Sequence, residues 1–266
     1  MKRWTALGAL LALALGFGSC GGASGDDVVI FAAASLRDVL QDLRPVLRQA
    51  TGREPVYNFA GSNVLAQQIE AAPVADVFLS AHERWVDFLE ESGRLVPGTR
   101  RVFTSNRLVV VTHRDSELVI REPRDLASPA VRFVSLGDPS AVPAGVYAKA
   151  FLEQVELPGG GTLWEAVRDR VAPAPDVRAA LGMVEARPDV VGIVYRTDAM
   201  QSADVEVRFA VPPGSAPPIL YVAAAVQGGP AGPQVAGKVL ETLGSPGAKE
   251  ILEGHGFAVE IPEAPP

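Results

Sequence analysis

The chain has 266 residues, of which 48% are hydrophobic and 21% are charged, and its formal net charge is −7. This length and composition are typical of a globular protein with one large domain or two modest ones. The acidic excess disfavours nucleic acids and anionic membrane surfaces as partners. Any anion that the chain binds must therefore be held by an organised local site.

Residues 1–26 have the pattern of an export signal followed by a linker. Lys2 and Arg3 precede an apolar stretch at 6–17, which is too short to span a bilayer comfortably and is typical of a signal peptide. Cys20 is the only cysteine, which excludes a disulfide within the chain. A lone cysteine after such a stretch resembles the processing site of bacterial lipoproteins. We expect lipidation at Cys20, which would anchor the protein to a membrane, or cleavage nearby to a soluble form. Both outcomes place the protein outside the cytoplasm, in the periplasm or cell envelope.

From residue 28 the hydrophobic pattern alternates between strands and helices. Short apolar runs between turn residues predict strands, and apolar residues at helical spacing predict helices. In the first part of the chain, strands are expected at 28–33, 56–59 and 75–80, and helices at 36–51, 64–71 and 82–92. This alternation calls for a parallel sheet with helices on both faces.

The rest of the chain predicts a second unit of the same kind. Strands are expected at 108–112, 131–136, 190–195 and 219–226, and helices at 147–154, 163–171, 177–186, 235–243 and 248–253. A Pro-rich connector at 212–218 precedes the last strand. We expect that strand and the closing helices to return to the first unit. The predicted lobes are then 27–105 with 211–266, and 106–210.

Four short segments share one order, in which a strand-like run leads through a small or polar residue to a helix start. They lie at 28–36, 57–63, 137–145 and 174–178. Each would leave free backbone N–H groups, and the positive end of a helix dipole, at the carboxyl edge of a strand. Separate lobes could hold a small anion between them. The pattern favours a binding protein over an enzyme.

Several motifs in these regions, taken in their order along the chain, resemble those of a known protein family. They are the stretches at 31–36, 60–62, 75–81, 137–145, 176–178 and 192–195. In this order they resemble the substrate-binding proteins of molybdate ABC transporters. The resemblance implies a type II periplasmic-binding-protein fold, with two α/β lobes and a hinge of two crossover segments. It implies a monomer without a cofactor or nucleic-acid partner, which closes on molybdate or tungstate and delivers it to the permease.

The resemblance also implies a set of ligand residues, with no catalytic residue and no side chain that coordinates the metal directly. Two serine hydroxyls, two backbone N–H groups and one tyrosine hydroxyl would bind the oxygens of the anion. Carried over to this chain, they belong to Ser35, Ser62, Ala144, Val177 and Tyr195. The chain departs from the family pattern at Gly61 and Asn63, which flank one of the serines, and at His82. These changes remove none of the ligand residues.

Neutral donors suit a tetrahedral dianion, which offers oxygens but no protons. A helix start contributes roughly half a positive charge, so four of them balance about two negative charges without Arg or Lys. A receptor for sulfate or thiosulfate is the alternative in the same class, since only pocket size separates sulfate from molybdate. A secreted hydrolase with Ser35 or Ser62 as nucleophile is the alternative from another class. The chain lacks a Gly-x-Ser-x-Gly motif, which disfavours the hydrolase.

Other polar residues have simpler interpretations. Asp76 and Asp198 show no acid–base pairing in the sequence and are expected to be structural. The three histidines, His82, His113 and His255, are too far apart along the chain to have the spacing of a metal site. The segment 232–238 resembles a P-loop, but the residue after its lysine is Val and not Ser or Thr, so we interpret the match as chance.

Overall fold

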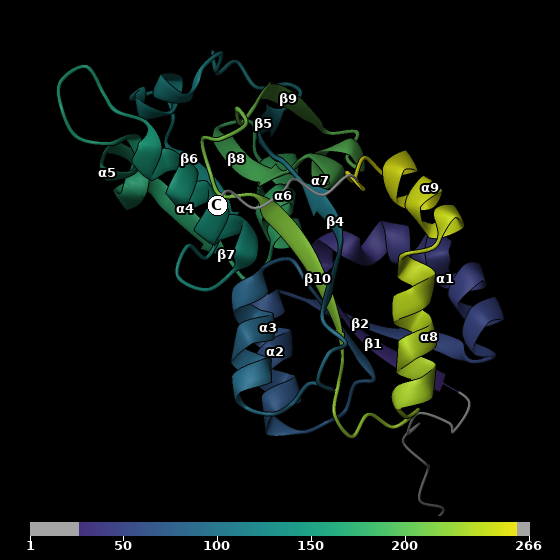
Figure 1. Ribbon diagram of the computed structural model, residues 1–266. Helices are drawn as coiled ribbons and strands as arrows, with labels where there is room; N and C mark the ends of the chain where they lie inside the picture. The colour runs from purple at the N-terminus through teal and green to yellow at the C-terminus, as the bar shows by residue number, and fades with distance from the viewer. Residues whose placement is uncertain (1–26, 260–266) are drawn as a thin grey trace, which may run out of the picture.

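The computed structural model describes residues 27–259 and has two five-stranded sheets (Figure 1). The strands of the first sheet, in spatial order, are β2 (Glu54–Ala60), β1 (Asp27–Ala33), β3 (Val77–Ser80), β10 (Ile219–Ala225) and β4 (Arg101–Asn106). Those of the second sheet are β7 (Val171–Ala174), β6 (Phe133–Gly137), β8 (Val190–Tyr195), β5 (Leu108–His113) and β9 (Val205–Ala210).

Nine α-helices accompany the sheets within the described part of the chain. They are α1 (Arg37–Thr51), α2 (Ser62–Ala71), α3 (Glu83–Glu91), α4 (Pro143–Gln154), α5 (Leu163–Val167), α6 (Val177–Ala186), α7 (Arg196–Met200), α8 (Pro233–Leu243) and α9 (Pro246–Gly254). Short 3-10 turns lie at Ala34–Leu36, Pro123–Ala127 and Arg168–Arg170. None of the helices within 27–259 is both long and apolar enough to cross a membrane.

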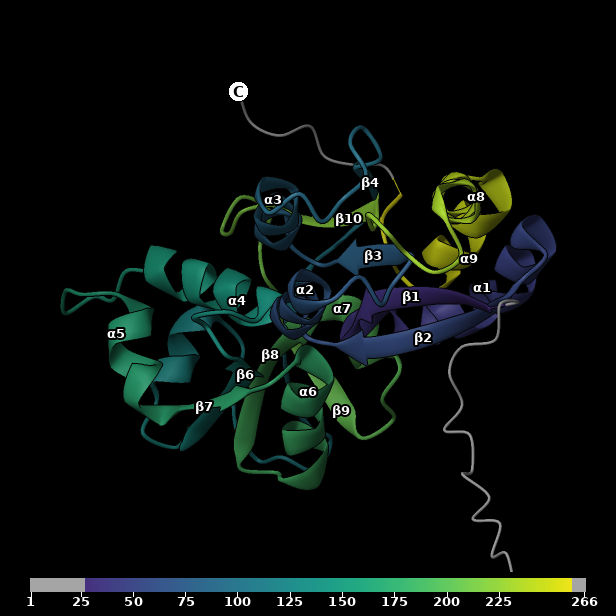
Figure 2. The same ribbon diagram turned by 90° about the horizontal axis from the view of Figure 1, so that it is seen from below.

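Alternation along β1 explains how the first sheet is covered. Successive side chains of a strand point to opposite faces. Val28, Ile30 and Ala32 belong to the core that includes α1, α8 and α9, whereas Phe31 packs in a separate core with α2 and α3. The first sheet and these five helices are called lobe 1, and the second sheet with α4 to α7 is called lobe 2. Figures 1 and 2 show the lobes one beside the other.

The chain crosses between the lobes twice. Arg107 alone separates β4 from β5, and residues 211–218 connect β9 to β10. The strands entered by these crossings, β5 and β10, run antiparallel to both of their neighbours. The remaining pairs, β1 with β2 and β3, and β6 with β7 and β8, are parallel. The C-terminal strand β10 lies in the first sheet, and each sheet is mixed, whereas the sequence predicts a parallel sheet.

Three strands are absent from the sequence-based assignment. β4 has polar residues at four of its six positions, β7 has only four residues, and β9 alternates apolar with charged residues. β7 replaces the end of the helix expected at 163–171, which stops at Val167 as α5 and continues as a 3-10 turn. Pro173 lies in β7, which is an edge strand where a missing N–H is tolerated.

Candidate functional site

A small cavity lies between the lobes, and all five predicted ligand residues line it. They are Ser35, Ser62, Ala144, Val177 and Tyr195. The volume of the cavity is about 10 Å³, and a single water molecule needs about 10–15 Å³ on this scale. The structure therefore brings together segments that lie far apart in the sequence, and it holds them closely around one point.

Lobe 1 supplies the two serines from its first two strand-to-helix connections. Ser35 lies in the 3-10 turn after β1, and its Oγ shares a hydrogen bond of 2.8 Å with the hydroxyl of Tyr221. Ser62 is the first residue of α2, and its Oγ accepts the N–H of Ala81 at 3.1 Å. A hydroxyl that accepts one hydrogen bond can still donate its proton. The hydroxyl of Ser62, which lines the cavity, therefore keeps its capacity to donate.

Gly61, which precedes Ser62, is one of the departures from the family pattern, and its surroundings explain why a glycine fits there. Gly61 precedes α2 and lines the cavity, and a Cβ at this position would lie 2.8 Å from the carbonyl oxygen of Pro175 in lobe 2. Real Cβ atoms essentially never come so close to another atom. Glycine at this position therefore allows the lobes to approach each other.

Lobe 2 presents two helix N-termini. The first N–H groups of a helix have no acceptor within the helix. Helix α4 begins at Pro143, with Val142 as a cap that offers no side-chain acceptor, so the N–H of Ala144 stays available. At α6 the carboxylate of Asp176 accepts the N–H groups of Arg178 and Ala179 at 2.8 and 2.9 Å. The N–H of Val177 is not among those capped.

Tyr195 contributes the most direct sign of a ligand. It ends β8, only 1% of it is exposed, and within residues 27–259 its hydroxyl has no hydrogen-bond partner. Burial holds the pKa of this phenol well above its usual range, so it stays a neutral donor. A buried polar group without a partner costs about 1–3 kcal/mol. An acceptor in the cavity would remove this cost.

No Lys or Arg is among the described residues that line the cavity. The neighbouring guanidinium, Arg178, forms ion pairs with Asp38 and with Asp198, whose Oδ1 lies 2.5 Å from the Nε of the arginine. Asp198 is completely buried, and burial raises its pKa to about 7 against the opposing charge of Arg178. The cavity therefore offers hydroxyl and N–H dipoles in place of a cation.

Several residues with simpler expected roles have structural contacts. Asp76 accepts the N–H groups of Val29 and Ala231 at 2.7 and 2.6 Å, in keeping with a structural carboxylate. His255 lies 2.8 Å from Asp42 on the surface. Among the residues that the structure describes, no group of three or more His, Cys, Asp or Glu side chains could hold a metal ion.

Contacts across the interface between the lobes were not predicted from the sequence. Trp85 donates its Nε1–H to the carbonyl of Ala141 in lobe 2 at 3.1 Å. His82 stacks on Tyr147 of lobe 2 with ring centroids 4.9 Å apart. These pairs are far apart in sequence, and no local pattern could have indicated them.

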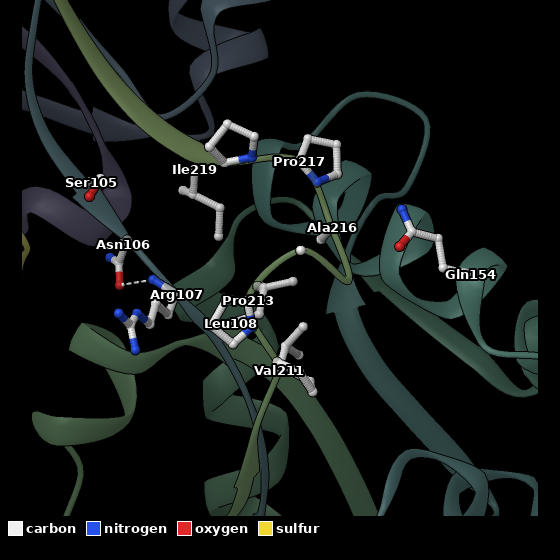
Figure 3. A pocket seen from close by; sticks show the side chains of 13 residues that line it. Ser105, Asn106, Arg107, Leu108, Gln154, Val211, Pro213, Ala216, Pro217 and Ile219 are labelled. Carbon is white, nitrogen blue, oxygen red and sulfur yellow. Dashed lines mark hydrogen bonds between the residues drawn. The ribbon is translucent and has the colours of Figure 1, made fainter. Parts of the chain in front are cut away.

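A larger cavity of about 590 Å³ lies beside the two crossings (Figure 3). Its walls are mainly apolar and include Leu108, Val211 and Ile219, with prolines from the connector. Arg107 is its one cationic lining residue in the described chain. An apolar wall cannot replace the hydration of a small dianion. This cavity is therefore a poorer oxyanion site than the small one, despite its size.

Comparisons with known proteins agree with this geometry. Residues 28–258 match the family model described as bacterial extracellular solute-binding protein. The chain is 35% identical to a protein named molybdate-binding protein ModA from Haemophilus influenzae, over 98% of this chain and 100% of the relative.

Two solved structures show that the fold is the two-lobed one of periplasmic binding proteins. The periplasmic molybdate-binding protein of Azotobacter vinelandii is similar with a TM-score of 0.75 and 22% identity, over 87% of this chain and 98% of that one. The sulfate-binding protein SubI of Mycobacterium tuberculosis is similar with a TM-score of 0.74 and 16% identity, over 88% of this chain and 87% of that one. This chain belongs to the bacterial extracellular solute-binding proteins, in the group that contains the ModA relative.

Proposed function

We propose that this protein binds molybdate or tungstate between its two lobes, outside the cytoplasm, and delivers it to the permease of an ABC transporter. The observation that carries the proposal is the buried hydroxyl of Tyr195, which has no hydrogen-bond partner among residues 27–259 and lies in the same cavity as Ser35 and Ser62. The ModA relative, which shares 35% of its residues with this chain, supports the choice of ligand.

In the proposed complex the anion is held by neutral donors from both lobes. Ser35 and Ser62 donate hydroxyl protons from lobe 1, while Ala144 and Val177 donate backbone N–H groups from lobe 2. Tyr195 adds the fifth donor. Hydrogen bonds to a charged group contribute about 1.5–3 kcal/mol each, and micromolar to nanomolar binding needs roughly 8–12 kcal/mol. Five such bonds would contribute about 7.5–15 kcal/mol in total, a range that spans this requirement, and desolvation and lobe closure would offset any excess.

The small volume of the cavity bears on how the anion enters. At about 10 Å³ the space between the elements of both lobes is too small to admit a tetrahedral oxyanion without a movement of the lobes. Entry therefore requires the lobes to part at the two crossings, and binding draws them together. We propose that the moving bodies are 27–105 with 211–266, and 106–210. Small-angle scattering should then show a smaller radius of gyration when molybdate is bound.

The ligand is tested by thermal unfolding and calorimetry with molybdate, tungstate and sulfate. A ligand at one hundred times its dissociation constant stabilises the folded state by about 2.7 kcal/mol. We expect molybdate and tungstate to raise the melting temperature at micromolar concentrations, and sulfate only at much higher ones, because a donor shell sized for longer metal–oxygen bonds fits sulfate loosely. Stabilisation by sulfate alone would replace the molybdate assignment with the alternative of a sulfate receptor.

The membrane anchor depends on Cys20, which lies outside the described residues. We propose that the signal is cleaved before Cys20 and that the lipidated cysteine anchors a monomer to the membrane. An intact-mass measurement on protein purified from cell envelopes should show a diacylglyceryl-modified N-terminus. The Cys20→Ser variant should move to the soluble exported fraction. Soluble wild-type protein that begins after residue 20 would contradict the anchor but not the ligand.

A further inference from the structure

Arg178 links the two lobes immediately beside the small cavity. It follows Val177 in the first turn of α6, and its guanidinium forms ion pairs with Asp198 of lobe 2 and with Asp38 of lobe 1. The side chain of Arg178 is 23% exposed, and that of Asp38 is 36% exposed. The cross-lobe pair is therefore partly shielded from solvent.

The pair within lobe 2 holds the guanidinium in place. Asp198 is completely buried, and its Oδ1 lies 2.5 Å from the Nε of Arg178. A buried carboxylate needs a compensating cation, so we expect Arg178 to stay paired with Asp198 when lobe 1 moves away. The guanidinium is thereby left with its outer N–H groups directed at Asp38, and an arginine presents several donors in one plane for such a double role.

The positions of the paired residues join this contact to the ligand site. Asp38 lies in the first turn of α1, directly after the turn that holds Ser35. Arg178 directly follows Val177. Each lobe therefore carries a ligand residue and an ion-pair residue on the same short segment. A movement that brings Ser35 and Val177 to one anion also brings Asp38 and Arg178 together.

We propose that Arg178 is a positioning residue that couples oxyanion binding to lobe closure through its ion pair with Asp38. This inference rests on the proposed function. The guanidinium does not touch the anion. Its effect is to stabilise the closed arrangement, so loss of the pair should speed release of the anion and leave the rate of association nearly unchanged.

The test is Asp38→Asn, which removes the cross-lobe charge and leaves the pair between Arg178 and Asp198 intact. The matched control is Glu54→Gln, because Glu54 pairs with Arg44 at 2.5 Å entirely within lobe 1. Molybdate affinity is measured by calorimetry. The release rate is measured by stopped-flow fluorescence of Trp85, whose indole contacts lobe 2, in a Trp164→Phe background.

Asp38→Asn could change the molybdate affinity in two ways, and these two changes have opposite signs. Removing a negative charge near a dianion should by itself tighten binding. Loss of the closure contact should weaken it. We expect Asp38→Asn to raise the dissociation constant and the release rate about threefold to tenfold, and Asp38→Lys to raise them further. Glu54→Gln should leave both within error of the wild type.

The outcomes separate the inference from the function on which it rests. If wild-type protein binds molybdate and Asp38→Asn binds it equally well or more tightly, Arg178 has no role in closure and the inference is overturned. If the wild type binds no molybdate, the proposed function fails and the coupling fails with it. A release rate raised equally in Glu54→Gln would also overturn the inference, since the effect would then belong to any lost ion pair.

Discussion

At the scale of single residues, Tyr195 and Ser62 differ in what their hydroxyls contact inside the protein. The hydroxyl of Tyr195 is buried and has no partner in the described chain, whereas Ser62 Oγ accepts the N–H of Ala81 at 3.1 Å. A buried donor without an acceptor destabilises the folded state. Tyr195 therefore costs stability in the absence of a ligand, and Ser62 does not.

This difference gives a prediction for Tyr195→Phe. Removal of an unpartnered hydroxyl should leave the melting temperature of the free protein unchanged or slightly raised. Loss of one hydrogen bond to a dianion should raise the molybdate dissociation constant at least about tenfold. Calorimetry and thermal unfolding of the same sample measure the two effects.

Ser62→Ala is the comparison variant, because it should change both quantities. It removes a donor to the anion and also leaves the N–H of Ala81 buried without its acceptor, at a cost of about 1–3 kcal/mol in unfolding free energy. Tyr195 would be a structural residue if Tyr195→Phe lowered the melting temperature as much as Ser62→Ala and left the affinity unchanged.

At the scale of elements, the start of α6 shows how a helix N-terminus serves folding and binding together. Asp176 caps the helix through the N–H groups of Arg178 and Ala179, and it also lines the cavity. Its carboxylate thus orders the turn that presents the N–H of Val177. The same carboxylate places a negative charge in the wall of an anion site, where it opposes binding.

Two substitutions at Asp176 should separate these effects. Asp176→Asn keeps a good capping acceptor and removes the charge, so stability should stay close to that of the wild type and molybdate affinity should rise. Asp176→Ala removes the cap and should lower the unfolding free energy by about 1 kcal/mol. Urea denaturation and calorimetry measure both. Weaker binding by Asp176→Asn would mean that the carboxylate assists the anion.

At the scale of the whole molecule, the stacked rings of His82 and Tyr147 form another contact between the lobes. His82 precedes α3 in lobe 1, and Tyr147 lies in α4 of lobe 2. The Nδ1 of His82 accepts the N–H of Arg84 at 3.1 Å at the start of α3. Burial, together with the charge of Arg84, lowers the pKa of His82 below its ordinary value of 6.5, against the opposing charges of Glu83 and Asp87. The neutral ring is therefore the form that the folded protein favours.

The shift gives His82 a defined contribution to the pH dependence of stability. A lowered pKa in the folded state means that the unfolded chain binds the proton more readily, so this contribution is present above about pH 6.5 and is lost on acidification below it. His82→Asn keeps a capping acceptor and does not titrate. Between about pH 7.5 and 5.5, the wild type should lose more unfolding free energy than His82→Asn. Equal losses would assign the pH dependence to other groups.

Most elements of both lobes could be predicted because their signals are local. The apolar run of β1 and the helical spacing of α1 can be seen without any neighbour. The strands that escaped prediction, β4, β7 and β9, have short or polar patterns and owe their structure to pairing with β10, β6 and β5. Pairing partners contributed by distant segments leave no mark on a short stretch of sequence.

The strand-to-helix turns that contain Ser35, Ser62, Ala144 and Val177 could be recognised in the sequence, because a free helix start is a property of a few consecutive residues. The choice of these four as proposed ligand residues came from the family resemblance. Their meeting in one cavity depended on the two crossings and on the register of two sheets. Three contacts join segments that are separated along the chain. Ser35 shares a hydrogen bond with Tyr221, Ser62 accepts one from Ala81, and Arg178 forms an ion pair with Asp38. The first two contacts form when the strands and helices of lobe 1 assemble, and the third forms only when the two lobes meet. None is visible in a short stretch of sequence, because hydrogen bonds and partly shielded ion pairs act only over a few ångströms.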